Sequence, residues 1–180
     1  DTVIVNENIS ISQLSKGKNY NPYLINDQEF YAIAWGCPLL NNKENHNELI
    51  NIISRGEINK IKNVDGQFLV LFISKDTNKV TLVSDRFNGI NLFYSQIGET
   101  LYCSSSYYLL ASELKRRGNF KWSDEIIYDL IRMNRVFGNS TYDVLSKFLS
   151  PATILNYDFK ELKEQKYWKP NFQKCFYKNN

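Results

Sequence analysis

The spacing of apolar and polar positions changes along this chain and separates predicted strands from predicted helices. Residues 68–73 are apolar at every position and too few for a membrane span, which is typical of a strand covered on both faces. Turn signals at Asp76-Thr77-Asn78 and Ile97-Gly98-Glu99-Thr100 divide the surrounding β-rich sequence, so consecutive antiparallel strands are expected. The four predicted strands cover about residues 67–74, 79–85, 91–96 and 100–104.

Apolar residues at helical spacing predict four helices on either side of these strands. Gly56 and Gly118 follow two of them as stop signals, and Ser123 caps another whose apolar stripe extends to Met133. The predicted helices cover about residues 46–54, 58–63, 106–117 and 124–133, with a weaker helical turn at 142–149. Further short strands are expected at 2–5, 9–11, 30–35 and 152–157, with a loop at 16–26 and a strand break at Gly36-Cys37-Pro38.

This order of elements predicts an α+β fold in which mixed, mainly antiparallel sheets carry helices on their outer faces. A chain of 180 residues, 43% of them hydrophobic, can bury one sizeable core. We therefore expect a single folded domain over residues 1–165, with 166–180 as a linker or the start of another domain.

Charge and cysteine content exclude several classes of protein. With 22 basic and 19 acidic residues and no long run of one sign, the chain lacks the basic surface of a nucleic-acid-binding domain. Its three cysteines are widely spaced and accompanied by one histidine, so neither a disulfide framework nor a zinc site is indicated. The sequence shows no span of membrane length and no secretory signal, so a cytoplasmic protein without a membrane partner is expected.

Three ordered motifs carry a resemblance to a known family. They are Val64-Asp65-Gly66-Gln67-Phe68, then residues 84–94 with Asp85-Arg86, Gly89 and Leu92-Phe93-Tyr94, and then the strand-to-helix run at 103–110. The set resembles the N-terminal glutaminase domain of the asparagine synthetase family over about residues 30–170. The resemblance implies the αββα sandwich of N-terminal-nucleophile (Ntn) hydrolases and class-II glutamine amidotransferases. It also implies that Asp65, Gly66, Asp85, Arg86 and Tyr94 are structural signature residues.

The same resemblance implies that the glutaminase chemistry is missing. Family members use an N-terminal Cys as nucleophile, and residue 1 here is Asp. The family's oxyanion loop aligns with Trp35-Gly36-Cys37, and its acidic residue that holds the substrate amine aligns with His46. These four residues are therefore expected to form a remnant of the substrate pocket, with no catalytic residue. A retained scaffold without the Cys resembles the β-lactam synthetases and, with its shortened N-terminal part, the lasso peptide cyclases more closely.

The candidate residues also have plainer interpretations. Cys37 is expected to be an ordinary partly buried thiol rather than a nucleophile, and His46 a solvated or helix-capping side chain. Asp85 and Arg86 are expected to form a structural charge pair at a strand end rather than to bind a charged substrate. Neither Thr2 as a nucleophile after loss of Asp1 nor base stacking by the tyrosines is favoured.

Three functions are consistent with the sequence. The first is a glutaminase-inactive domain that scaffolds an ATP-dependent, amide-forming synthetase, whose substrate is a peptide or a small amino-acid-derived carboxylate. The second is a stand-alone, non-catalytic module that binds a protein or peptide, and the third is a glutaminase whose N-terminal Cys is missing from this chain. No cofactor is expected here, because the eight glycines form no phosphate-binding loop.

The first function places ATP and Mg²⁺ in a synthetase domain or subunit outside these residues. That synthetase is then the expected partner, and a homodimer is the other association considered. The aromatic stretch that begins at Tyr167-Trp168 is expected to lie at the edge of the interface, because it follows the last core strand.

Overall fold

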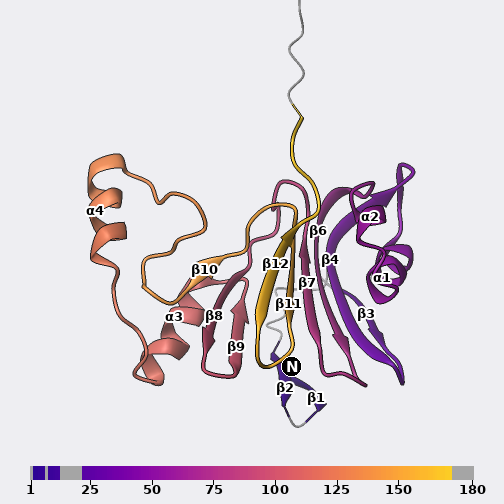
Figure 1. Cartoon of the computed structure of the whole chain (residues 1–180), viewed down its shortest axis with the longest axis horizontal. Coiled ribbons are helices and arrows are strands. Elements are labelled where there is room, and N and C mark those ends of the chain that lie inside the picture. Colours follow the sequence, from indigo (N-terminus) through magenta and orange to yellow (C-terminus); the bar gives the residue numbers. More distant parts are fainter. Residues whose placement is uncertain (1, 7, 13–21, 172–180) are drawn as a thin grey trace, which may run out of the picture.

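The structure is a computed structural model that describes residues 2–6, 8–12 and 22–171 (Figure 1). The described strands before the first helix are β1 (Thr2–Asn6), β2 (Ile9–Ser12), β3 (Tyr23–Asn26), β4 (Phe30–Leu40) and β5 (Lys43–Glu44). Two helices and four strands follow: α1 (His46–Ser54), α2 (Ile58–Ile61), β6 (Asp65–Ser74), β7 (Val80–Ser84), β8 (Phe93–Ile97) and β9 (Thr100–Ser104). The remaining elements are α3 (Tyr107–Arg116), α4 (Asp124–Met133), β10 (Lys147–Phe148), β11 (Thr153–Tyr157) and β12 (Leu162–Lys166).

A seven-stranded sheet forms the centre of the molecule. Its strands lie in the order β12-β11-β7-β6-β4-β3, and β5 pairs with the end of β4. The longest pairing joins β4 to β6, from Phe30 opposite Ser74 to Leu39 opposite Asp65. Every strand pair in the described part of the chain is antiparallel, so the predicted α+β fold with mainly antiparallel sheets is confirmed.

The two faces of this sheet are covered by different elements, because alternate residues of each strand point to opposite faces. On one face Ala34, Phe68 and Val83 pack with the buried isoleucines of α1 and with Ile61 of α2. Full burial of one such isoleucine contributes about 2 kcal/mol. The amphipathic helices predicted at residues 46–54 and 58–63 are therefore present, and they cover the face that their apolar stripes require.

The opposite face is covered by a smaller sheet with the strand order β10-β8-β9. Leu92 and Tyr94 pack there on Leu69, Leu82 and Leu155 of the larger sheet. Helix α3 lies on β8 and β9, where its Tyr107 ring meets Phe93 edge to face at a centroid distance of 5.7 Å. The molecule thus has four layers, in the order α1 and α2, larger sheet, smaller sheet, α3.

Residues of β2 cover a further part of the same face. Ile9 and Ile11 pack on the buried Tyr31, Ile33 and Ile73, which lie beyond the region covered by the smaller sheet. The short strands expected near the N-terminus are therefore present as a β1–β2 pair, and β2 extends the core.

Several predicted boundaries are wrong for identifiable reasons. The predicted break at Gly36-Cys37-Pro38 lies inside β4, because Gly36 adopts φ +89° and lets the strand continue opposite β6. The helical turn expected at 142–149 is absent: Asp143 Oδ1 accepts hydrogen bonds from the N–H groups of Leu145 and Ser146, and Lys147–Phe148 pair with β8. The expected loop at 16–26 contains β3 in its described part, and strand β12 was not predicted.

Candidate functional site

The predicted pocket remnant lies at the end of the β4–β6 pairing, where two glycines meet. Gly36 has φ +89° and Gly66 φ +87°, both in the left-handed region. A Cβ added to Gly36 would lie 2.2 Å from the carbonyl oxygen of Gln67, and one added to Gly66 would lie 2.1 Å from that of Cys37. The close approach of the two backbones therefore requires glycine at both positions.

His46 is the most highly connected polar residue of this region. It opens α1 next to Asn45, whose side chain accepts a hydrogen bond from Glu48 N. His46 Nε2 lies 2.9 Å from the carbonyl oxygen of Gly36, so this nitrogen carries the proton and donates. Its ring stacks on Tyr23 at a centroid distance of 5.0 Å, and Nδ1 lies 3.4 Å from Glu44 Oε1. The imidazole is only 14% exposed, and Asn45 rather than His46 caps the helix, so the expected solvated or helix-capping role of His46 is wrong: the ring is held by the Gly36 carbonyl and by Tyr23.

Cys37 lies beside the same carboxylate. Partial desolvation and the hydrogen bond and charge of Glu44 raise the pKa of the Cys37 thiol. The thiolate is the nucleophilic form of cysteine, so a raised pKa opposes nucleophilic catalysis. The Cys37 side chain is exposed rather than partly buried as expected from the sequence, so it is accessible but weakly reactive.

Trp35 is separated from the other three remnant residues. Its side chain is half-buried and packs on the clusters around Leu69 and Ile33, on the face of the larger sheet that the smaller sheet and β2 cover. Gly36, Cys37 and His46 are brought together at the strand end, whereas the Trp35 indole fills space between layers. Neither Tyr23 nor Glu44 was predicted from the sequence, because both reach the site through strand pairing rather than through a motif.

The signature residues organise the turn after β7. Asp85 is 1% exposed, and its carboxylate accepts hydrogen bonds from the N–H groups of Phe87 at 2.7 Å, Gly89 at 2.9 Å and Phe68 at 3.2 Å. Such complete hydrogen bonding satisfies a buried carboxylate and fixes the loop to β6. Both carboxylate oxygens of Asp85 therefore make structural hydrogen bonds, and neither is directed at a ligand.

The other signature residues contact neighbouring segments. The Arg86 guanidinium pairs with Asp65 rather than with Asp85, as had been expected. It also donates to the carbonyl oxygen of Lys62 and lies 5.4 Å from the Trp168 ring. The Tyr94 hydroxyl donates a hydrogen bond to Glu164. Burial, and then this carboxylate, raise the pKa of Tyr94.

The chain after β12 stays attached to the larger sheet as far as Trp168, because the Tyr167 hydroxyl donates a hydrogen bond to the carbonyl oxygen of Ser84 at 2.8 Å. Residues 172–177 of the expected interface stretch, and Cys175 with them, lie outside the described residues.

A separate groove with a volume of about 240 Å³ opens between α1–α2 and the larger sheet. Its floor and walls are apolar, with Phe72, Val83 and Ile154 from the sheet and Ile53 and Ile61 from the helices. Polar side chains lie at its β7–β11 end: Lys79, Thr81 and Asn156. Among the residues that line the groove only Lys79 is charged, and most of the side chains are apolar, so the lining indicates an apolar contact surface.

Helix α4 forms an exposed surface that the sequence did not predict. The helix expected from the apolar stripe through Ile126, Ile127, Leu130 and Met133 is present, and none of its residues is fully buried. Ile131 is 77% exposed and Met133 56%. Figure 1 shows the helix beyond α3 and β10, with no other labelled element beside it.

Within the described residues, no group of three or more His, Cys, Asp or Glu side chains is arranged to hold a metal ion. No helix in the same part of the chain is both long and apolar enough to span a membrane. Comparison with models of known protein families finds no match, and comparison with curated proteins finds none either.

Proposed function

We propose that this chain is a glutaminase-inactive domain that scaffolds an asparagine synthetase-like, ATP-dependent amide-forming enzyme. The succession of helices, larger sheet, smaller sheet and helix is the layer order expected of the αββα sandwich of Ntn hydrolases and class-II amidotransferases, and it supports the proposal. The observation that supports the proposal most directly is the hydrogen bond from His46 Nε2 to the carbonyl oxygen of Gly36 at 2.9 Å.

That hydrogen bond occupies the position at which the resemblance requires substrate-binding groups. An acidic residue at position 46 would attract the ammonium group of glutamine, whereas an imidazole that donates to Gly36 offers no such charge. Trp35 replaces an amide donor with an indole packed between layers, and the pKa of Cys37 is raised. Catalytic groups of this kind act as a unit, so the absence of several removes the activity by orders of magnitude.

Glutamine binding tests this proposal without depending on a nucleophile. In a titration of the ¹⁵N-labelled chain with millimolar L-glutamine, we expect the amide signals of Gly36, Cys37 and His46 to stay unchanged. Saturable shifts confined to these residues would instead favour a glutaminase domain that lacks only its Cys. Glutamine hydrolysis above a buffer blank would contradict the proposal directly.

The synthetase partner is tested on the whole open reading frame that contains this chain. The proposal expects a Ser-Gly-Gly-x-Asp-Ser pyrophosphate loop in the same polypeptide or in a co-purifying subunit. It further expects ATP-dependent amide formation that is lost when this domain is deleted. This chain alone should show no ATP binding by calorimetry, because its glycines form no phosphate-binding loop.

A stand-alone binding module is the second candidate, and the exposed apolar stripe of α4 favours it specifically. A reading frame that ends without the synthetase loop, in a protein that no synthetase subunit accompanies, would favour this alternative. A peptide or protein partner would then be the ligand, since an exposed apolar helix face is a protein-binding surface.

A further inference from the structure

Helix α4 presents an apolar face that the described part of the chain covers only in part. At 100° per residue, Ile126, Ile127, Leu130, Ile131 and Met133 fall on one side of the helix. Ile126, Ile127 and Leu130 are half-buried, and the last two are exposed. A short helix is not stable in water through its own hydrogen bonds, so α4 depends on contacts along this face.

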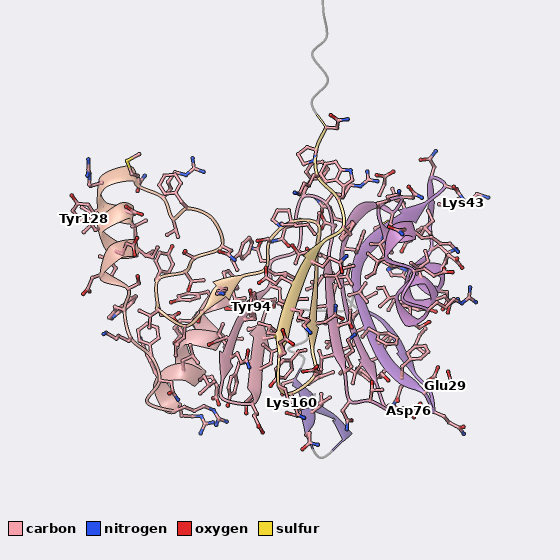
Figure 2. The ribbon with its side chains drawn as sticks, in the orientation of Figure 1. Glu29, Lys43, Asp76, Tyr94, Tyr128 and Lys160 are labelled. Atoms are coloured by element: carbon pink, nitrogen blue, oxygen red, sulfur yellow. The ribbon has the colours of Figure 1, made fainter. Side chains whose placement is uncertain are left out.

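The other side of α4 is polar and directed to solvent. Arg132 lies over the Tyr128 ring at 5.5 Å, and Tyr128 projects outward from the helix (Figure 2). Ser123 caps the N-terminus by accepting a hydrogen bond from Ile126 N at 3.4 Å. The helix is therefore complete at its start and on its outer face, and its apolar stripe is the side that lacks a partner.

The charges at the two ends of α4 indicate what that partner is. Asp124 and Glu125 occupy the first turn, Arg132 lies in the last turn, and Arg135 follows the left-handed residue Asn134 that ends the helix. A second copy of α4 placed antiparallel brings the acidic end of each helix beside the basic end of the other. It also aligns the helix dipoles favourably, whereas a parallel copy places like charges together.

We propose that α4 pairs antiparallel with α4 of a second copy of this chain, through the stripe that includes Leu130, Ile131 and Met133. The pair is isologous, since the same surface serves both protomers, as in most homodimers. This inference is independent of the scaffold role, because it concerns a surface far from the pocket remnant.

The expected dimer is weak unless neighbouring segments contribute. A helix of 10 residues extends about 15 Å, which is short of the area of a standard interface. Exposed apolar side chains also lie on the segments that flank α4, namely Trp122, Phe137, Val144 and Leu145. With their contribution, self-association is expected with a dissociation constant on the order of 10 to 100 µM.

Sedimentation velocity over a concentration series tests the surface. We expect a reversible monomer–dimer equilibrium that Ile131→Glu weakens about tenfold or more, because a charge would enter the apolar contact. Ile131 is 77% exposed, so the substitution removes no core contact. Leu24→Glu is the matched control, since Leu24 is 47% exposed on β3 at the other end of the molecule (Figure 1). It should leave the equilibrium unchanged.

Charge exchange tests the antiparallel orientation. The acidic-end variant Asp124→Lys/Glu125→Lys and the basic-end variant Arg132→Glu/Arg135→Glu should each dimerise less than the parent chain. An equimolar mixture should form a heterodimer, because one chain then presents basic residues at both ends of α4 and the other acidic residues. A parallel pair already opposes like charges in the parent chain, so the weaker dimerisation of each variant alone is the result that identifies the antiparallel orientation. Circular dichroism of each variant reports whether α4 stays helical.

Three results would overturn the inference. They are a monomer at all concentrations, a dimer that Ile131→Glu leaves intact, and a mixture of the two charge variants that associates no better than either variant alone. The first means that another part of the chain or another protein covers α4. The second means that a different surface makes the dimer, and the third excludes a pair that is oriented by the charges at the ends of α4.

Discussion

The hydroxyl of Tyr107 donates a hydrogen bond to Oδ2 of Asp143, 2.9 Å away, and this contact joins α3 to the loop that follows α4. Asp143 is 3% exposed. Its carboxylate also accepts hydrogen bonds from Leu145 N at 2.9 Å, Ser146 N at 2.8 Å and the hydroxyl of Thr141 at 3.3 Å. One buried side chain therefore fixes the return of the chain from α4 to β10.

Replacing Asp143 with Ala should consequently destabilise the fold strongly. Because four donors lose their acceptor in a buried place, we expect a loss of about 3 kcal/mol in the free energy of unfolding, against about 1 kcal/mol for Tyr107→Phe. Urea unfolding of the single and double variants measures both. In the Asp143→Ala background, Tyr107→Phe should lower the free energy of unfolding only slightly. If the two losses of stability were fully additive, the two side chains would not be energetically coupled.

Glycine at position 36 should be irreplaceable for a steric reason. We expect Gly36→Ala to lower the free energy of unfolding by about 3 kcal/mol, since the new Cβ meets the Gln67 backbone and the residue must keep a left-handed conformation. Gly98→Ala is the matched control: its φ is +57°, and a Cβ there would have no atom within 4 Å.

The control should cost about 1 kcal/mol, the penalty for a left-handed non-glycine residue alone. The difference between the two variants isolates the steric conflict between β4 and β6. Equal losses in a thermal or urea melt would mean that the two backbones can separate at little cost.

Glu113 at the end of α3 should give a measurable dependence of stability on pH. Hydrogen bonds from Arg116, then from Arg117, lower the pKa of this carboxyl from 4.5 to about 2. A carboxyl whose pKa is lowered by folding stabilises the folded state above its unfolded pKa. That stabilisation is lost as the pH falls from about 4.5 through about 2.

Glu113→Gln should remove this contribution, so the difference in urea midpoint between parent and variant should shrink across that pH interval. The effect should be small and weakened by salt, because the three side chains are at the surface. A difference between parent and variant that stays constant from neutral pH to pH 2 would exclude the ion cluster as its source.

Cys37 should react slowly with alkylating reagents near neutral pH. Partial desolvation and Glu44 raise its pKa, so little thiolate is present. Glu44→Gln should lower that pKa and increase the rate of iodoacetamide modification severalfold at the same pH. Peptide mass spectrometry reports the modification of Cys37 separately from that of Cys103, the second exposed thiol in the described part of the chain, whose rate should stay unchanged as an internal control. A pH–rate profile for Cys37 that is identical in both proteins would contradict the role of Glu44.

Local sequence signals predicted the centre of the fold well. Strands β6 to β9 were predicted because each turn between them carries residues suited to positive φ, such as Asn78 and Gly98. The end of α1 before Gly56 and the N-cap of α4 at Ser123 were also predicted, since capping depends only on neighbouring residues. From β6 to β9, the pattern of apolar residues and the residues at the turns indicated the same strands.

Non-local pairing explains what was missed. Strand β12 has one half-buried residue, Leu162, so it carries little hydrophobic pattern and is defined by its pairing with β11. The polar cluster at the candidate site was missed in the same way. Tyr23 reaches His46 through β3, and Glu44 reaches Cys37 through the β4–β5 pairing, so no motif in the sequence connects them. The α4 segment was correctly predicted to be a helix, but the periodicity of its apolar residues does not identify what covers them.

The order of strands in the larger sheet leaves it with two unlike margins. At one margin, β12 presents Lys163, Glu164 and Lys166, charged side chains that oppose the addition of another strand. At the other, β3 reads Tyr23-Leu24-Ile25-Asn26, without charge and with Leu24 facing solvent, and the described residues place no strand beyond it. Aggregation by strand addition should therefore begin at β3, and a single lysine at Leu24 would give that margin the protection that β12 already has.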